Sequence, residues 1–328
     1  MLKIGVVGVG HLGKIHLRLL KEIDLFEIVG VFDTNEDRMR VAETAFNLRH
    51  YSSFDELLEA ADVIDIVTPA VSHHNYAAQA LRKSKHIFIE KPVTCSTEEA
   101  KDIVALASEA HVKVQVGHVE RFNPAFIAAQ PFIRHPLFIE VHRLSTPGVR
   151  GRDVSVVHDL MIHDIDIILS MVKSPVKKVW ANGVSIISDT VDLVNARIEF
   201  DNSCVANLTA SRIALSNRRV ARFFQKDAYI TIDFLEKKTS VIKLLHSPNN
   251  SELPSFIDEL EQRQSSKFLN FTEPVIIPNN AIQTELKFFG EAILKDTATP
   301  VTIEDAYDAI KITNQIIEKF KPVSLMDN

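Results

Sequence analysis

The sequence predicts an α/β chain in two parts, a doubly wound parallel sheet followed by an α+β domain with an open, mostly antiparallel sheet. In the first third, short apolar runs alternate with helical stretches, a pattern typical of a parallel sheet covered on both faces. A Gly-x-Gly-x-x-Gly turn at Gly8, Gly10 and Gly13 follows the first of these runs. After about Arg121, β segments joined by turns indicate an antiparallel sheet.

The first domain is expected to span residues 1–121. Its continuous apolar runs predict five strands, at Ile4–Val7, Glu27–Phe32, Val63–Val67, His86–Ile89 and Val112–Val116. The polar and amphipathic stretches between them predict helices at Lys14–Lys21, after Asp33 to about Phe46, at Asn75–Arg82 and at Thr97–Ala110.

The second domain is expected to span residues 122–328. Strand Phe138–Leu144 leads through a basic loop to an apolar helix over about Val157–Val172. Further strands are predicted at Val176–Ile187, Leu193–Phe200, Val205–Ala214, Ala221–Phe224 and Ala228–Phe234. Residues 244–280 are polar and are predicted as loops with a short helix. Helices near Ala281–Leu294 and Ile303–Phe320 end the chain and can pack back on the first domain.

Composition narrows the class of protein. The 328 residues are 46% hydrophobic and 24% charged, which excludes disordered, collagen-like and coiled-coil chains. The net charge of −6 predicts neither a nucleic-acid nor a membrane partner, and no apolar run is long enough for a membrane span. The chain enters a strand directly, without a signal peptide. Two cysteines, Cys95 and Cys204, cannot build a disulfide framework, so a cytoplasmic location is expected.

The glycine turn predicts dinucleotide binding, because only glycine lets the backbone turn tightly and approach a pyrophosphate. Asp33 ends the second strand, 25 residues after Gly8. Its carboxylate can accept from ribose hydroxyls and would repel a 2′-phosphate, which favours NAD over NADP. Arg38 argues against this preference, since its side chain could reach a 2′-phosphate. The alternative is a turn that binds another nucleotide or nothing.

Lys91 lies at the carboxyl end of the fourth predicted strand, within Glu90-Lys91-Pro92. Ligands of open parallel sheets bind at this edge. A lysine there could hydrogen-bond a substrate hydroxyl and stabilise the alkoxide that forms on oxidation. The alternative is an exposed lysine paired with Glu90.

The apolar helix over about Val157–Val172 carries polar side chains. Asp159, His163 and Asp166 are spaced i, i+4 and i+7, on one face. A carboxylate one turn from an imidazole can fix its tautomer and suit it to accept a proton. Two alternatives stay open: a structural His–Asp pair, and a metal site that includes His158 and Asp164, although no second ligand cluster exists and no metal is expected.

Together these motifs resemble the Gfo/Idh/MocA oxidoreductases. The matching segments are Gly8-x-Gly10-x-x-Gly13-x-x-His16, Asp33, Thr68-Pro69-x-x-x-His73, Lys85-His86-Ile87-x-x-Glu90-Lys91-Pro92, Gly117-x-x-x-Arg121-Phe122-Asn123-Pro124 and Asp159-x-x-x-His163. One departure is Ser84, where the family commonly has glycine. The resemblance implies a Rossmann domain, NAD(P) as cofactor, and a homodimer or homotetramer formed through the C-terminal sheet.

The resemblance also assigns site residues. It implies that Lys91, Asp159 and His163 are catalytic. The cofactor would be bound by Gly8, Gly10, His11, Leu12, Gly13, Asp33, Arg38, Thr68, Pro69, His73, Glu90 and Lys91.

Within the family, Gly117–Ala125 is most similar to the UDP-N-acetylglucosamine 3-dehydrogenase branch, which oxidises the sugar C3 hydroxyl. Arg121, Asn123, Arg150 and Arg152 are the expected substrate contacts, and the basic loop, taken to include Arg143, would suit a diphosphate. The alternatives are an inositol or free-sugar dehydrogenase of the same family, a non-catalytic NAD-binding regulatory protein, or a metal-dependent enzyme.

Overall fold

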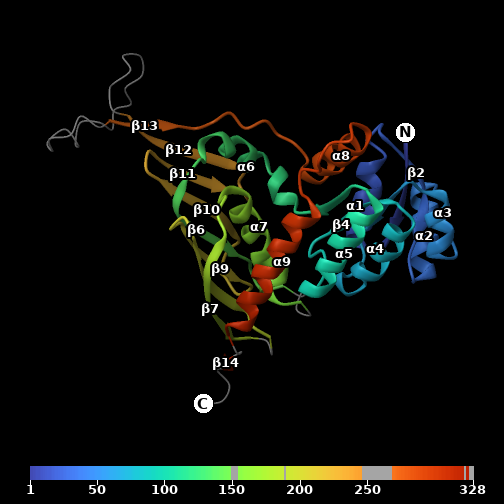
Figure 1. Cartoon of the computed structure of the whole chain (residues 1–328), viewed down its shortest axis with the longest axis horizontal. Coiled ribbons are helices and arrows are strands. Elements are labelled where there is room, and N and C mark those ends of the chain that lie inside the picture. The colour runs from blue at the N-terminus through green and yellow to red at the C-terminus, as the bar shows by residue number, and fades with distance from the viewer. Residues whose placement is uncertain (149–153, 188–189, 246–267, 321–322, 325–328) are drawn as a thin grey trace. The chain divides into compact units, whose positions relative to one another are not determined.

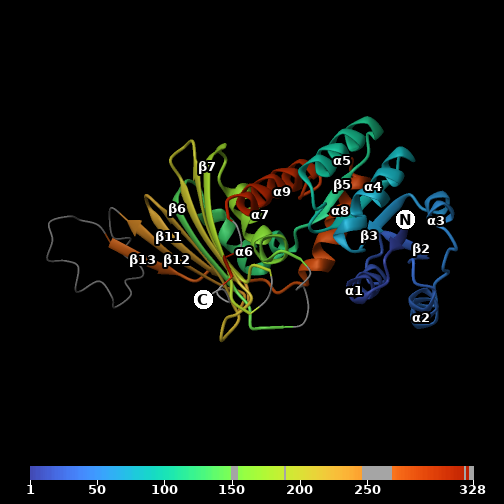
Figure 2. The same ribbon diagram turned by 90° about the horizontal axis from the view of Figure 1, so that it is seen from below.

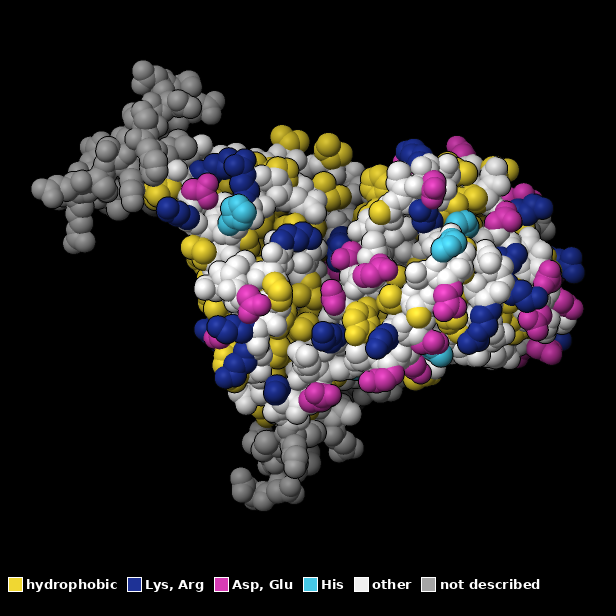
Figure 3. Space-filling model, viewed as in Figure 1, with side chains coloured by type: hydrophobic (Ala, Val, Ile, Leu, Met, Phe, Trp, Pro, Cys, Tyr) yellow, Lys and Arg dark blue, Asp and Glu magenta, His cyan; other side chains and the backbone are white. Residues whose placement is uncertain are grey.

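The chain forms two compact units, and the structure, a computed structural model, describes residues 1–148, 154–187, 190–245, 268–320 and 323–324 (Figure 1). Unit 1 comprises Met1–Phe122 and Asn280–Asn314, and unit 2 comprises Asn123–Asn279 and Gln315–Asn328. Within the described ranges no helix has the length and apolar character needed to cross a membrane. Acidic and basic side chains are interspersed over the face seen in Figure 3.

Unit 1 contains the predicted parallel sheet. Its strand order is β2-β1-β3-β4-β5, and every neighbouring pair is parallel. The strands are β1 Leu2–Val7, β2 Phe26–Phe32, β3 Val63–Ile66, β4 His86–Glu90 and β5 Val114–Gly117. All four residues of β3 are buried, as expected for a strand covered on both faces. The doubly wound arrangement predicted from the apolar runs is confirmed.

Helices cover both faces of this sheet. They are α1 His11–Leu20, α2 Glu36–Phe46, α3 Phe54–Ala60, α4 His73–Arg82 and α5 Thr97–Ala110. Figure 2 shows α1 and α2 on one side of the sheet and α4 and α5 on the other. Side-chain caps begin three of them, since Asn35, Ser53 and Ser96 each accept a backbone N–H of the first turn. Helix α3, which lies between Phe46 and β3, was not expected from the sequence.

The chain returns to unit 1 near its C-terminus through α8 Ala281–Leu294 and the first part of α9 Ile303–Glu318. Leu286 and Phe289 of α8 are fully buried in the core that contains Leu17 and Phe88. The Thr299 hydroxyl donates to the Val114 carbonyl at 2.9 Å. The C-terminal segment therefore completes the hydrophobic core of the first sheet.

Unit 2 is built on a nine-stranded sheet with the order β13-β12-β11-β10-β6-β9-β8-β7-β14. The strands are β6 Pro136–Leu144, β7 Val176–Ser185, β8 Leu193–Phe200, β9 Val205–Ser211, β10 Arg218–Gln225, β11 Ala228–Asp233, β12 Lys238–Leu245, β13 Phe268–Thr272 and β14 Val323–Ser324. Six of the eight neighbouring pairs are antiparallel, and β6–β9 and β7–β14 are parallel. The open, mostly antiparallel sheet is confirmed.

One face of this sheet is covered by helices. Helix α6 Pro124–Ala129 contacts β11 and β12, and α7 Ile162–Met171 contacts β6. Figure 2 shows α6 and α7 on the same side of the sheet. Burial alternates along the strands, for example in β8, so the other face carries partly exposed side chains.

The expectation of loops and a short helix over residues 244–280 was wrong in its described part. Strand β12 runs to Leu245, and β13 pairs antiparallel with it, with Phe271 opposite Ile242. Residues 246–267 lie outside the described ranges. The five residues of β13 are flanked by polar and proline residues, so their alternation was too short to stand out.

A carboxyl group is buried in the core of unit 1. Glu285 of α8 is 0% exposed, and within the described part of the chain neither of its side-chain oxygens has a hydrogen-bond partner. Burial, and then the nearby negative charge of Glu90, raise the pKa of Glu285 well above its ordinary value. Glu285 is therefore a neutral carboxylic acid at neutral pH, and the stability that it contributes is present at low pH and is lost as the pH rises through its folded-state pKa.

Replacing Glu285 with glutamine should raise the melting temperature at alkaline pH. The amide has the same shape and does not titrate, so Glu285→Gln removes the loss of stability that arises when the unfolded chain ionises and the buried acid keeps its proton. We expect a Tm close to that of the wild type at pH 5 and about 2–4 °C higher at pH 8, measured by calorimetry. Glu109→Gln, which changes an exposed acid of α5, is the control. A difference that is the same at both pH values would contradict the buried-acid interpretation.

Candidate active site

The glycine turn after β1 brings the start of α1 close to the sheet. Gly8 has φ +94°, and a Cβ there would lie 2.6 Å from the Val67 carbonyl oxygen. A Cβ on Gly13 would lie 1.9 Å from the Gly8 carbonyl oxygen. A side chain at either position would therefore push the helix away from the turn.

Gly10 differs from the other two glycines of the turn, Gly8 and Gly13. Within the described residues nothing lies within 4 Å of a Cβ built on Gly10. It is also the N-cap of α1 and provides no side-chain cap, so the first N–H groups of α1 are left for another acceptor. His11 and Leu12, predicted to contact the cofactor, form the first turn of this helix. An open helix N-terminus next to a glycine-rich turn fits a dinucleotide pyrophosphate.

Asp33 follows β2 beside this turn and is 9% exposed. One carboxylate oxygen accepts the Val9 N–H and the other accepts the Asn35 N–H, both at 2.9 Å. The carboxylate is thus held next to the glycine turn, and its remaining lone pairs can accept ribose hydroxyls. Arg38, the residue that could favour a 2′-phosphate, lies exposed on α2.

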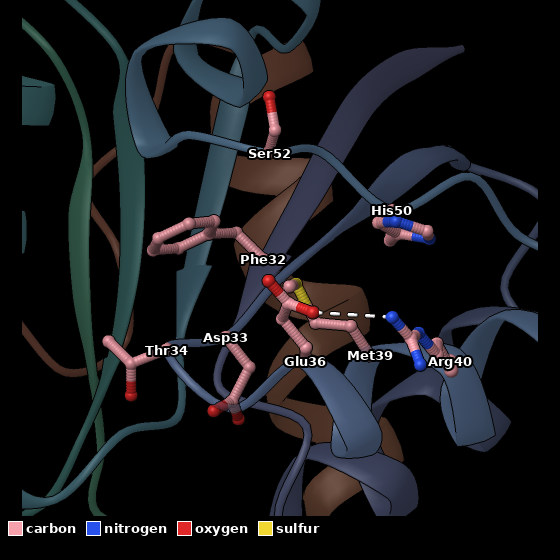
Figure 4. Close-up of a pocket in the computed structure, with 8 residues that line it drawn as sticks. All are labelled: Phe32, Asp33, Thr34, Glu36, Met39, Arg40, His50 and Ser52. Atoms are coloured by element: carbon pink, nitrogen blue, oxygen red, sulfur yellow. Dashed lines mark hydrogen bonds and ion pairs between the residues drawn. The ribbon is translucent and has the colours of Figure 1, made fainter.

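A cavity of about 430 Å³ opens at the end of β2. Its lining is Phe32, Asp33, Thr34, Glu36, Met39, Arg40, His50 and Ser52 (Figure 4). Figure 4 shows Arg40 joined to Glu36 of the same helix, and their side-chain atoms are 3.3 Å apart. The volume falls within the range of small-molecule sites, and six of the eight lining residues are polar.

His73 ties together the loops after β3 and β4. It is 1% exposed, and its ring nitrogens lie 2.8 Å from the Thr68 carbonyl oxygen and 2.9 Å from the Pro92 carbonyl oxygen. Burial lowers the pKa of His73. Thr68 is half-buried and Pro69 is exposed. The loop with two predicted cofactor contacts is thereby joined to the Glu90-Lys91-Pro92 segment.

Lys91 is half-buried directly after β4, and the Lys91–Pro92 peptide bond is cis. Glu90 is 8% exposed, and its carboxylate accepts the Lys91 N–H at 3.1 Å while its other oxygen lies 3.2 Å from Nε2 of His16. Burial raises the pKa of Glu90, but His16 and Lys91 together lower it by more than burial raises it. The pKa of Glu90 is therefore below its ordinary value. This geometry differs from an exposed lysine paired with a surface glutamate, since Glu90 is held inside unit 1.

In unit 2 the predicted apolar helix begins with a π-helical turn at Val157–Met161 and continues as α7. Because a π-helix bonds residue i to i+5, a four-residue spacing does not align Asp159 and His163 as it would in an α-helix. Both side chains are half-buried, whereas Asp166 is 1% exposed. That Asp159 fixes the tautomer of His163 stays a prediction.

Arg212, which the sequence reasoning missed, lies beside Asp159. Its Nη2 atom is 3.8 Å from the Asp159 carboxylate and donates to the Val154 carbonyl. Arg212 directly follows β9. The sequence showed only that an arginine lies near the end of a predicted strand. The proximity of Arg212 to Asp159 depends on tertiary packing, which the sequence pattern does not show.

The predicted substrate contacts lie in different environments. Arg121 donates to the Asp305 carboxylate at 3.0 Å. Asn123 caps α6 by accepting the Ala125 N–H at 3.1 Å, and it donates to the Phe234 carbonyl at 3.0 Å. Arg150 and Arg152 lie outside the described residues. The role of these four residues toward a substrate stays a prediction.

The assignment of Arg143 to the basic loop was wrong. Arg143 lies within β6, is 2% exposed, and makes two hydrogen bonds to the Asp164 carboxylate, at 2.9 and 2.7 Å. A buried guanidinium needs such a paired carboxylate, because an unpaired charge in the core is costly. Arg143 is therefore a structural residue and does not belong to a diphosphate-binding loop.

Metal ligation was one alternative for the helix that contains Asp159. Across the ranges that the structure describes, no group of three or more His, Cys, Asp or Glu side chains is arranged to hold a metal ion. Asp164, one of the considered ligands, instead pairs with Arg143. The expectation of no metal stays a prediction that a chelator would test.

Replacing Gly10 with alanine should abolish NAD binding without unfolding the protein. The added methyl group enters open space at the start of α1, so it costs little stability but occupies the place proposed for the pyrophosphate. We expect a loss of NADH affinity of a hundredfold or more (about 3 kcal/mol) by fluorescence titration, with an unchanged Tm.

Gly13→Ala is the contrast, because its methyl group would lie 1.9 Å from a backbone oxygen and should lower the Tm as well. NADH affinity of Gly10→Ala equal to that of the wild type would contradict this location for the cofactor.

Comparisons with known proteins identify this arrangement. The profile of the oxidoreductase family with an NAD-binding Rossmann fold, GFO_IDH_MocA, matches residues 2–118, and that of the GFO/IDH/MocA C-terminal domain matches residues 147–231. The chain is 37% identical over 235 residues to UDP-N-acetylglucosamine 3-dehydrogenase of Acidithiobacillus ferrooxidans, covering 71% of this chain and 74% of that protein. A solved structure of that enzyme aligns at a TM-score of 0.86 and 29% identity over 97% of both chains.

Inositol 2-dehydrogenase of Cereibacter sphaeroides is a further relative, 30% identical over 176 residues, which are 51% of this chain and 53% of that protein. Both family profiles match in chain order and together cover more than half of the residues. The chain therefore belongs to the GFO/IDH/MocA family of NAD-binding oxidoreductases.

Proposed function

We propose that the protein oxidises a secondary hydroxyl of a nucleotide sugar, the C3 hydroxyl of UDP-N-acetylglucosamine or a close analogue. The observation that carries the proposal is the position of Lys91 at the carboxyl end of β4. The glycine turn follows β1 of the same parallel sheet, so both lie at the edge where such sheets bind ligands. Similarity to a named UDP-N-acetylglucosamine 3-dehydrogenase supports the choice of sugar.

The catalytic roles follow from side-chain chemistry. NAD, when bound, supplies the acceptor for the hydrogen and two electrons that leave the carbinol carbon. Lys91 donates a hydrogen bond to the substrate oxygen and stabilises the negative charge that develops there. His163 accepts the hydroxyl proton, and Asp159, with Arg212 beside it, orients Lys91 or His163.

The binding roles are assigned mainly from the motifs that the chain shares with its family. The residues proposed for the cofactor are Gly8, Gly10, His11, Leu12, Gly13, Asp33, Arg38, Thr68, Pro69, His73, Glu90 and Lys91. Asp33 favours NAD over NADP, because its carboxylate would repel a 2′-phosphate. Arg121, Asn123, Arg150 and Arg152 are the proposed substrate contacts, and their arginines suit a diphosphate.

The second candidate is an inositol or free-sugar dehydrogenase, favoured by the similarity to inositol 2-dehydrogenases. The experiment that separates the two adds UDP-sugars, free sugars and inositols to the purified protein with NAD and follows absorbance at the reduced-nicotinamide band. Reduction with UDP-N-acetylglucosamine alone supports the proposal. Reduction only with free polyols overturns the substrate class, and no reduction with any compound favours a non-catalytic NAD-binding protein.

Lys91→Ala should lower turnover by on the order of a hundredfold or more, because charge stabilisation at the reacting oxygen is lost. NADH binding should stay largely intact, since Lys91 is one of twelve proposed cofactor contacts. Turnover is measured in the same absorbance assay and affinity by fluorescence titration. Lys83→Ala, which removes an exposed lysine paired with Glu59, is the control. Near-normal turnover in Lys91→Ala would overturn the catalytic role of Lys91.

We further propose a homodimer or homotetramer formed through the uncovered face of the unit 2 sheet. An aromatic cluster of Phe138, Phe224 and Tyr229 lies on three neighbouring strands, with ring centroids 5.7 and 4.7 Å apart. Leu269 and Phe271 of β13 are 42% and 51% exposed on the same face. Apolar surface of this kind, continuous across strands, is typical of a subunit interface.

Phe224→Glu should convert the oligomer to a monomer, because it places a charge in the centre of the proposed interface. Light scattering after size-exclusion chromatography measures the mass. Val41→Glu, which changes an exposed apolar residue of α2, should leave the mass unaltered. An oligomer unaffected by Phe224→Glu would place the interface elsewhere.

The cytoplasm is the proposed location. Cys95 and Cys204 are both free thiols, which fits a reducing compartment. Burial raises the pKa of Cys204 to about 11, so this thiol is unreactive at neutral pH.

A further inference from the structure

Three ionisable side chains form a buried row behind Lys91, all within unit 1. Asp65 of β3 and His16 of α1 are 0% exposed, and their Oδ2 and Nδ1 atoms are 3.0 Å apart. Nε2 of His16 lies 3.2 Å from Oε1 of Glu90, at the end of β4. The other oxygen of Glu90 accepts the backbone N–H of Lys91 at 3.1 Å. The row therefore runs from the middle of the sheet to the proposed catalytic lysine.

This arrangement is energetically costly. Burying a carboxylate or an imidazolium is unfavourable unless pairing offsets the loss of hydration, and replacing buried ion pairs by apolar side chains of similar size is often neutral or stabilising. The surrounding core is apolar, and the His16 ring packs edge-on against Phe88, with ring centroids 5.7 Å apart. Groups retained at such a cost are candidates for a functional role.

The protonation states of His16 and Glu90 follow from their neighbours. Burial lowers the pKa of His16, but Asp65 and Glu90 raise it well above its ordinary value, so His16 carries a proton between two acids. Glu90 also interacts electrostatically with His73, Lys91 and Glu285. The net effect lowers the pKa of Glu90, which remains a carboxylate.

The space around the Glu90 carboxylate is also defined. A Cβ built on Gly117 would lie 2.9 Å from one carboxylate oxygen and 3.0 Å from the other. Gly117 ends β5, whose backbone pairs with Glu90. With His16 on one oxygen and the Lys91 backbone on the other, the carboxylate has little room to move.

We propose that Asp65, His16 and Glu90 are positioning residues for Lys91, which hold its backbone at the strand end and keep a negative charge on the residue before it. The inference rests on the proposed catalytic role of Lys91. Asp65 anchors His16, His16 anchors Glu90, and Glu90 fixes the lysine at the strand end. Small displacements of a catalytic group cost ten- to about a hundredfold in rate, which is the size of effect that such a row can control.

A double-mutant cycle between Glu90 and Lys91 tests the inference. Glu90→Gln keeps the size of the side chain and removes its charge. We expect kcat to fall at least about tenfold, with a smaller change in the KM and affinity for NAD, because Glu90 is also a proposed cofactor contact. In the Lys91→Ala background the same change should alter kcat by less than about twofold, since a residue that acts only through Lys91 has nothing left to position. His16→Gln, which removes the charge at the next step of the row, should behave in the same way.

Asp102→Asn is the matched control, because it removes the carboxylate partner of His74 elsewhere in unit 1. Its kcat should equal that of the wild type. If Glu90→Gln proves too unstable to purify, His16→Gln carries the cycle alone.

The outcomes separate the two proposals. If Lys91→Ala keeps normal turnover, the proposed catalytic role fails. If Lys91→Ala is impaired but Glu90→Gln and His16→Gln lower kcat equally with and without Lys91, the row is not acting through the lysine and the inference is overturned. Wild-type kcat in both row variants would also overturn it.

Discussion

The proposed chemistry of unit 1 depends on one carboxylate, that of Glu90. It meets His16 through one oxygen and the Lys91 backbone through the other, and Gly117 leaves the space that it occupies. These partners come from the helix after the glycine turn, the end of β4 and the end of β5. One buried charge therefore explains why a histidine after the turn, a Glu-Lys pair and a glycine on the next strand occur together.

The parallel sheet of unit 1 was readable from the sequence because its signal is local. Strands buried on both faces appear as continuous apolar runs, and the glycine turn requires one strand before it and one helix after it. By contrast, the return of α8 to this sheet depends on contacts between distant residues, such as the bond from Gln115 to the Glu285 carbonyl, 170 positions apart. No local sequence pattern indicates such a contact. The sequence therefore predicted α8 as a helix but not the contacts that it makes with this sheet.

The site in unit 2 was less predictable for the same reason. The spacing of Asp159 and His163 assumed α-helical geometry, but the helix opens with a π-helical turn, which the sequence pattern does not indicate. Which charged residues pair with each other is also determined by tertiary packing and not by their separation in the sequence. Arg143 is paired with Asp164, and Arg212 lies beside Asp159 although 53 residues separate them. Residue types could be predicted there, but their partners could not.

The core of unit 1 shows how stability and activity compete. Asp65, His16, Glu90 and Glu285 bring three acids and one imidazole into a buried region. All four cannot be charged at once, so Glu285 keeps its proton while Glu90 gives up its own to remain paired with His16. Apolar side chains of similar size are often neutral or stabilising replacements for such groups, but they would provide no fixed charge behind Lys91. The cost of burying these groups is a compromise between stability and activity that functional sites often show, and it agrees with the positioning role proposed for the row.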